Sequence, residues 1–230
     1  MKLSTLLSVM CACACVASAQ VPPVWPPESA GWRLAIDPDH DCEFALTNEG
    51  LRISVPGDRP HDLAAEVDTT NAPRVLKTVD GDFTISVQVD GRYSPGDDST
   101  LSGRMAYTGA ALVAIADSRN VVTLARATVQ YPGEKPTSYA NFEIRANGNL
   151  LRMGNSGDHL LPRSGPVFLR LSRHGSEFVA AVSRDGKQWD ELAPQRVPTR
   201  WQKELLVGVA AISSSEKTFR PVFSYLDLQP

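Results

Sequence analysis

Cysteine is nearly absent from most of the chain. Cys11, Cys13 and Cys15 lie close to the N-terminus, and Cys42 is the only other one. If the N-terminal segment is removed, no intramolecular disulfide can form, so burial of apolar side chains has to stabilise the fold. Cys42 is either a reactive or intermolecular thiol, or a small buried hydrophobic residue. We favour the second interpretation, because no feature of the sequence lowers the pKa of this thiol.

The sequence also lacks an excess of charge of either sign. Its 230 residues contain 23 Lys and Arg against 26 Asp and Glu, a formal net charge of −3. Nucleic-acid binding requires clustered basic side chains, so we expect no nucleic-acid partner. Hydrophobic residues at 42% and charged residues at 21% are typical of an ordinary globular domain.

Long hydrophobic runs are missing as well, apart from one at the start. The run Leu3–Val16 follows Lys2 and is too short to cross a bilayer comfortably, so we expect no membrane span. Ala17-Ser18-Ala19 provides the small residues that signal peptidase requires. We expect a cleaved signal peptide at residues 1–19 and a secreted or periplasmic protein. A proline-rich segment at 20–30 and one domain at 31–230 would follow.

A helical period of apolar residues is absent, whereas a period of two is common. Phe83, Ile85, Val87 and Val89 alternate with polar residues, as in a half-buried strand. The runs at 109–116 and 205–212 are apolar at successive positions, which is typical of central strands covered on both sides. The pair Asn147-Gly148 predicts a hairpin turn. Together these patterns predict an all-β fold, a two-sheet antiparallel β-sandwich or jelly roll.

Several stretches, in order along the chain, resemble a known family. They are "DPDHDCEF" (37–44), "VPGDRPHDL" (55–63), "NAPRVLKTVDGDFTISVQV" (71–89), "YTGAALVAI" (107–115), "FE" (142–143), "LRLSRHGSEFVAAVSRDGKQW" (169–189) and "VGVAA" (207–211). The sequence is similar to the concanavalin A-like jelly-roll proteins of the "regulation of enolase" group, a domain family of unknown function. The resemblance implies the same sandwich. Related sandwiches include lectins, glycan-binding modules and some glycosidases, which is an analogy of fold only.

Three aspartates form a candidate metal site. Asp37, Asp39 and Asp41 alternate like the first ligands of a calcium-binding loop. An EF-hand would continue with Gly at its sixth position and Glu at its twelfth, where this chain has Cys42 and Asn48. A calcium site of another kind remains one interpretation, and an acidic turn without a cofactor is the other.

The segment 61–83 is the densest in polar residues. His61 and Asp62 are candidates for a hydrogen-bonded pair, and Arg74 for a clamp on a ligand. Asp82 and Glu143 would complete a cluster if their strands were neighbours. The alternative is that these residues only cap loops and shape turns.

Two aromatic residues are candidates for stacking on a sugar ring: Tyr107 and Trp189. Trp189 is instead explained by packing over the hairpin that "RDG" (184–186) begins. The acidic motif of jelly-roll glucanases starts with Glu66 and Asp68 but has Thr70 and Asn71 where a last Glu is needed.

Three functions follow from these patterns. The leading hypothesis is an exported, non-catalytic module that recognises a carbohydrate or a cell-envelope polymer. The second is a glycoside hydrolase or lyase that uses an acid pair such as Glu143 and Asp82. The third is a cell-envelope domain that binds another protein.

Overall fold

The computed structural model describes residues 25, 31–32, 34–198, 201 and 203–230. The expected signal peptide (1–19) lies outside these residues, as does the expected proline-rich segment (20–30) except Trp25. Trp25 is half-buried and packs against the core. Within the described residues no helix has the length and apolar character needed to cross a membrane.

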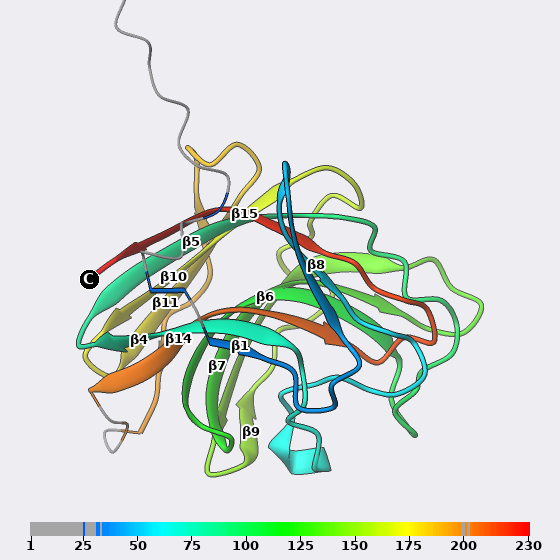
Figure 1. The fold of residues 1–230 in the computed structure, drawn as a ribbon, viewed down its shortest axis with the longest axis horizontal. Coiled ribbons are helices and arrows are strands. Elements are labelled where there is room, and N and C mark those ends of the chain that lie inside the picture. The colour runs from blue at the N-terminus through cyan, green and yellow to red at the C-terminus, as the bar shows by residue number, and fades with distance from the viewer. Residues whose placement is uncertain (1–24, 26–30, 33, 199–200, 202) are drawn as a thin grey trace, which may run out of the picture.

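Two antiparallel sheets form the two layers seen in Figure 1. The seven-stranded sheet contains, in spatial order, β1 (Leu34–Ile36), β4 (Arg74–Asp80), β14 (Glu204–Ser213), β6 (Ala106–Asp117), β7 (Asn120–Gln130), β8 (Thr137–Ala146) and β9 (Asn149–Arg152). The eight-stranded sheet contains β12 (Asp190–Glu191), β11 (Glu177–Ser183), β10 (Val167–His174), β5 (Phe83–Asp90), β15 (Val222–Gln229), β3 (Gly50–Ser54) and β2 (Glu43–Thr47), while β13 (Gln195–Arg196) pairs with β11. The predicted two-sheet antiparallel sandwich is therefore confirmed.

Alternating side chains fill the space between the two sheets. In β5 the predicted positions Phe83, Ile85, Val87 and Val89 are buried, and the intervening positions are partly exposed. They pack against inward-facing residues of the other sheet, such as Leu112 of β6. Among the described residues the cysteine, Cys42, is free. This core stabilises the sandwich, because burial of apolar area is the dominant favourable contribution to folding.

A second apolar cluster covers part of the outer face of the seven-stranded sheet, the face turned away from the eight-stranded sheet. It joins outward-facing residues of β6, β7, β8 and β14 to Leu63 and Ala72. The segment that carries these two residues also contains the short 3₁₀ helix η2 (Ala65–Val67), the cyan turn beneath the sheets in Figure 1. Central strands buried on both faces, as the runs at 109–116 and 205–212 predicted, result from this cover.

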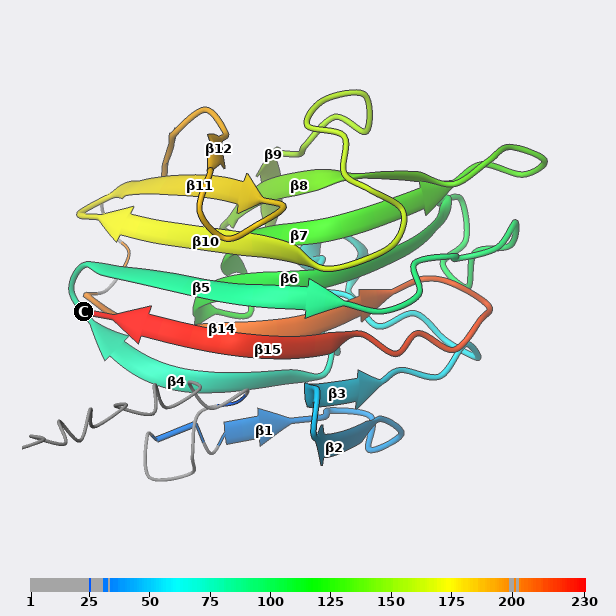
Figure 2. The same cartoon turned by 90° about the horizontal axis from the view of Figure 1, so that it is seen from above.

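The predicted hairpin between β8 and β9 is confirmed. Asn147 and Gly148 adopt φ values of 54° and 78° at its turn. Two successive residues with positive φ match the twist of the flanking strands, and Asn followed by Gly accepts that backbone at low cost. Figure 2 shows how β8 then lies beside β7 and β6, which places their outward side chains together.

Candidate functional site

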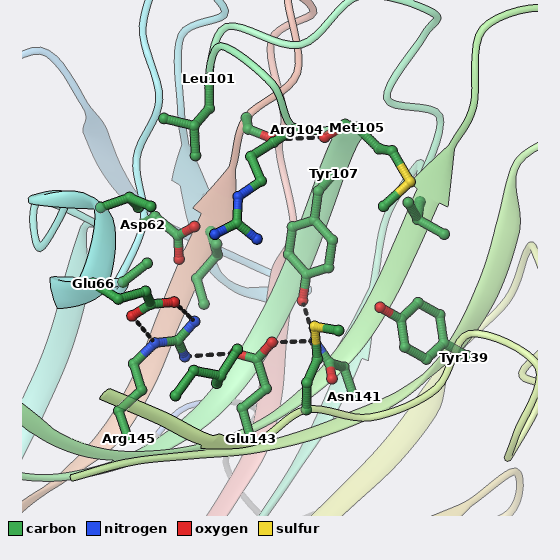
Figure 3. Close-up of a pocket in the computed structure, with 17 residues that line it drawn as sticks. Asp62, Glu66, Leu101, Arg104, Met105, Tyr107, Tyr139, Asn141, Glu143 and Arg145 are labelled. Atoms are coloured by element: carbon green, nitrogen blue, oxygen red, sulfur yellow. Dashed lines mark hydrogen bonds and ion pairs between the residues drawn. The ribbon is translucent and has the colours of Figure 1, made fainter. Parts of the chain in front are cut away.

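A pocket lies on the outer face of the seven-stranded sheet (Figure 3). Its space of about 110 Å³ has room for several water molecules. The sheet provides its floor, and the segment containing η2 and the loop before β6 provide walls. Its lining residues are Asp62, Ala64, Glu66, Val67, Leu101, Arg104, Met105, Tyr107, Val129, Tyr139, Asn141, Glu143, Arg145, Leu150, Met153, Ile212 and Ser214.

Strand β8 contributes four of these side chains through simple alternation. Ala140, Phe142 and Ile144 face the core, so the residues between them and on either side face the pocket. The pocket-facing residues of β8 are Tyr139, Asn141, Glu143 and Arg145. Four outward-facing side chains of one strand, three of them strongly polar, indicate a surface that binds a ligand.

A buried network of charges forms one end of the pocket. The Arg145 guanidinium donates from Nε and Nη2 to the Glu66 carboxylate at 2.9 and 3.1 Å, and from Nη1 to Glu143 Oε2 at 2.6 Å. The exposed fractions of these side chains are 6%, 19% and 12% respectively. Bidentate bonds of this kind fix the geometry of both groups. Burial works against the charged form of Glu66, yet the bonds from Arg145 hold the pKa of Glu66 below its ordinary value.

Asn141 organises the other end of the pocket. Its Nδ2 donates to Glu143 Oε1 at 2.9 Å and to the Tyr107 hydroxyl at 3.2 Å, and its Oδ1 accepts from the Gly154 amide at 2.9 Å. These partners fix which way the amide points. Burial, reinforced by Tyr139 and Glu143, raises the pKa of Tyr107 well above its usual range. The Tyr107 hydroxyl therefore stays protonated and can donate a hydrogen bond to a ligand.

The small residue at position 109 makes room for the Tyr107 ring. A Cβ atom on Gly109 would lie 2.9 Å from the Tyr107 hydroxyl oxygen and 3.0 Å from Cε1. Contacts this short would force the ring to move. Glycine at this position therefore allows the ring to lie across the sheet, where Figure 3 shows it pointing toward Asn141.

Asp62 is the one carboxyl of the pocket whose pKa is raised, among the residues that the structure describes. Burial raises it to about 6, Arg145 opposes the rise, and Glu143 and Glu66 add to it. Its Oδ1 accepts from the Leu63 amide at 2.7 Å. The Asp62 carboxyl therefore changes charge near pH 6.

The rim of the pocket is mixed in character. The Arg104 guanidinium points between Asp62 and Tyr107 (Figure 3). Its charge helps to lower the pKa of Glu66. Met105 and Met153 are exposed at 39% and 60%. A guanidinium beside flexible apolar side chains offers a ligand both hydrogen-bond donors and an adaptable surface.

The structure brings together three of the predicted ligand-binding residues. Asp62, Tyr107 and Glu143 all line this pocket. His61 does not, because it is completely buried and bonds through Nε2 to Asp41 Oδ1 at 3.0 Å, not to Asp62. Arg74 does not line it either: its Nη1 donates to backbone carbonyls at positions 70 and 72, which shapes the turn before β4.

Two other predicted residues, Trp189 and Asp82, do not line the pocket. The Trp189 ring packs against the Arg170 guanidinium, whose Cζ lies 4.1 Å from the ring centroid, on the outer face of the eight-stranded sheet. Asp82 accepts a bond from the Gly175 amide at 2.7 Å, where the β4–β5 and β10–β11 turns meet. The structure therefore does not assemble the expected acid pair of Glu143 and Asp82.

The three aspartates considered for calcium use their carboxylates separately. Asp37 Oδ2 accepts from the Cys42 amide at 2.9 Å, and Asp39 Oδ2 accepts from Asn71 at 2.7 Å. Asp41 bonds to His61. Among the described residues, the group that converges is Asp41, Cys42 and His61.

Sequence reasoning missed most of the network around Arg145. Arg145, Asn141 and Tyr139 were not predicted, and Glu66 was considered only as part of a broken glucanase motif. The period of two in "YANFEIRA" (139–146) would have placed the β8 residues on one face. No sequence signal pairs Glu66 with Arg145, which are 79 residues apart.

Comparison with known proteins reveals similarity of fold. No protein-family model and no curated protein matches the sequence. A functionally unknown protein from Saccharomyces cerevisiae has TM-score 0.58 and 17% identity, covering 86% of this chain and 96% of its own. The carbohydrate-binding module CBM66 from Bacillus subtilis has TM-score 0.50 and 14% identity, covering 83% and 92%. The chain has a jelly-roll fold.

A GH43 protein from Bacillus licheniformis is similar in fold to this chain over part of its own length. Its TM-score is 0.58 at 16% identity, with 84% of this chain and 35% of that chain covered. The chain thus spans about a third of that enzyme. At these identities the matches establish the fold, and the resemblance to the "regulation of enolase" group stays a prediction.

Proposed function

We propose that the protein is an exported carbohydrate-binding module whose binding site is the outer-face pocket. The observation that carries the proposal is the set of oriented polar groups around Tyr107 on a rigid sheet. Ligand sites combine an apolar or aromatic surface with a few placed donors and acceptors, which is what Tyr107, Asn141, Glu143 and Arg104 provide. The carbohydrate-binding module among the structural neighbours supports this choice of ligand class.

In this proposal each group has a distinct role. The Tyr107 ring contacts the apolar face of a sugar, and its hydroxyl donates to a sugar oxygen. Glu143 and Asp62 accept bonds from sugar hydroxyl groups, while Arg104 donates to them. Arg145 holds Glu143 in place through the 2.6 Å bond and is a positioning residue. Because these partners are already fixed, binding requires little ordering of side chains.

A second candidate function is a glycoside hydrolase or lyase. It is favoured by Asp62, whose pKa of about 6 suits a general acid, in the same pocket as Glu143. Against it, Glu143 already accepts bonds from Arg145 and Asn141, which leaves it poorly placed to attack or activate a substrate. We therefore propose a non-catalytic role.

One experiment separates these functions. The full chain is screened on a glycan array and on a polysaccharide panel, and the release of reducing ends or unsaturated sugars is followed. Binding without product release is the expected result. Product release that is lost in Glu143→Gln or Asp62→Asn would establish the enzyme instead, and absence of binding to every glycan would overturn both.

Export is proposed together with this function. It is supported by the sequence of residues 1–19, with Lys2, an apolar run and Ala17-Ser18-Ala19. A glycan outside the cytoplasm is also the partner that an exported module would meet. We therefore propose a periplasmic or secreted location.

A further inference from the structure

A second group of reactive side chains lies outside the pocket. Asp41, Cys42 and His61 each offer one ligand atom, and these three atoms lie within 4.8 Å of one another. His61 Nε2 is 3.0 Å from Asp41 Oδ1, and Cys42 Sγ is 3.4 Å from the same oxygen. A carboxylate, a thiol and an imidazole are three different ligand types, and together they are typical of metal sites.

The backbone holds these groups from two directions. Asp41 and Cys42 lie just before β2, on the loop that follows β1. His61 comes from the segment after β3, where its amide donates to the Ser213 carbonyl at 2.7 Å and its carbonyl accepts from the Ser213 amide at 2.8 Å. The His61 side chain is completely buried. Its imidazole is therefore a fixed, preformed ligand and not a mobile surface group.

The cluster also contains polar atoms whose bonding is incomplete. Asp41 Oδ2 and Asp37 Oδ1 are buried and accept no hydrogen bond from the described residues, and His61 Nδ1 is likewise without a partner. Arg59 approaches Asp41 Oδ2 at 3.3 Å from a side chain that is half exposed. Arg59 therefore partly neutralises the Asp41 carboxylate, and a cation bound at Asp41 Oδ1 would share this carboxylate with the Arg59 guanidinium.

We propose that Asp41, Cys42 and His61 bind a zinc ion. Tetrahedral ligands at about 2.0–2.3 Å from zinc lie about 3.3–3.8 Å from one another. The separations of 3.0 and 3.4 Å from Asp41 Oδ1 to His61 Nε2 and Cys42 Sγ are near this range. Three protein ligands leave one position for water. Calcium is a poor fit, because it takes oxygen ligands and the cluster offers sulfur and nitrogen.

Zinc at this position would link two segments of the chain. It would tie the β1–β2 loop to the segment that carries His61, and the next residue, Asp62, is in the pocket. The site is nonetheless separate from the pocket, since none of its three ligands is among the lining residues. Zinc binding can therefore be tested without knowing the glycan.

The test uses Co²⁺ as a spectroscopic probe for zinc. The full chain carries Cys11, Cys13 and Cys15 replaced by Ser, so that Cys42 is the only thiol, and a phosphine keeps it reduced. We expect one equivalent of Co²⁺ to produce a sulfur-to-cobalt charge-transfer band that Zn²⁺ then abolishes. We also expect Zn²⁺ to raise the melting temperature and Ca²⁺ to leave it unchanged.

Variants decide whether the named residues are the ligands. Cys42→Ser should lose the charge-transfer band, and Asp41→Asn should weaken Co²⁺ binding by more than about 10-fold, the lower range for disturbed metal sites. Asp39→Asn is the matched control, because Asp39 bonds to Asn71 outside the cluster, and it should bind normally. If Cys42→Ser does not fold, the Asp41→Asn result decides alone. No band in the parent, a band kept in Cys42→Ser, normal binding by Asp41→Asn, or stabilisation by Ca²⁺ alone would overturn the proposal.

Discussion

At the scale of single residues, the pocket depends on the pairing of buried carboxylates with the Arg145 guanidinium. Glu66, Glu143 and Asp62 bring three carboxyl groups close to one guanidinium that is almost completely buried, Arg145. Desolvated charges are tolerated only when they are paired and hydrogen-bonded. Burial raises the pKa of Asp62, and Glu143 and Glu66 add to the rise that Arg145 opposes. Hydrogen bonds from Arg145 lower the pKa of Glu66 instead.

Replacing Asp62 with Asn should stabilise the protein above pH 6. The pKa of Asp62 is about 6 in the folded state and 3.8 in its ordinary range, so the folded state binds this proton more tightly. The Asp62 carboxyl therefore contributes to the free energy of unfolding below pH 3.8, and this contribution is lost as the pH rises through 6. At about 1.4 kcal/mol per tenfold change in proton affinity, the loss is up to about 3 kcal/mol.

Urea unfolding at several pH values measures this effect. Asp62→Asn keeps an oxygen that can accept from the Leu63 amide, so its stability relative to the parent isolates the ionisation. We expect the variant to be more stable at pH 7.5 and the advantage to disappear toward pH 4. A difference that does not change with pH would show that the carboxyl is not the titrating group.

Replacing Arg145 with Met should be strongly destabilising. The change leaves Glu66 and Glu143 buried without their cation, and removal of one partner from a buried pair costs about 3–5 kcal/mol. Arg196→Met is the control, because Arg196 is 77% exposed and its pair with Glu177 should contribute less than about 1 kcal/mol. Equal unfolding midpoints for the two variants would contradict the assigned network.

At the scale of elements, alternation explains both what the sequence predicts and what it does not. Strand β5 follows its predicted pattern because one face of it is core and the other is exposed. Tyr107 and Glu143 both project from predicted strands and both line the pocket. The partners Glu66 and Asp62 come from a segment whose position over the sheet depends on packing of Leu63 and Ala72, which no local pattern specifies.

Long-range pairing also decided the role of His61. Its neighbour in sequence, Asp62, was the expected partner, but the backbone bonds to Ser213 direct the imidazole inward to Asp41. Adjacent residues on an extended segment point to opposite sides, so the two side chains separate. Local sequence therefore identified polar residues correctly but not which of them would meet.

Replacing Gly109 with Ala should impair the pocket while leaving the fold intact. The added Cβ would lie 2.9 Å from the Tyr107 hydroxyl oxygen, so the ring must shift away from Asn141. We expect about 10-fold weaker glycan binding and a small change in melting temperature. Gly157→Ala is the control, because its Cβ would meet nothing closer than 3.6 Å. Unchanged affinity in Gly109→Ala would show that Tyr107 does not position the ligand.

At the scale of the whole molecule, the core between the two stacked sheets provides stability. The pocket lies on the outer face of the seven-stranded sheet. The core between the sheets is continuous, whereas the outer face of the seven-stranded sheet is only partly covered by the segment around η2. Binding residues placed on strands of such a sheet are held more rigidly than residues on loops. The open portion of this face is therefore where we expect ligands.

Export should leave a protein with one thiol. We expect cleavage after Ala19, which removes Cys11, Cys13 and Cys15 and leaves Gln20 at the N-terminus. Intact-mass measurement and thiol titration of the protein recovered from its host check this. Retention of residues 1–19, or more than one thiol in the recovered chain, would contradict it.

The most direct measurement of the central claim is calorimetric titration of one glycan from the array into three proteins: the parent, Asn141→Ala and Trp189→Ala. Asn141 connects Tyr107 to Glu143 in the pocket, whereas Trp189 lies on the other sheet. Loss of such a hydrogen-bonded group costs about 1–3 kcal/mol, so Asn141→Ala should bind about 5-fold to 150-fold more weakly. Trp189→Ala should bind like the parent. Normal binding by Asn141→Ala together with loss of binding by Trp189→Ala would contradict the account.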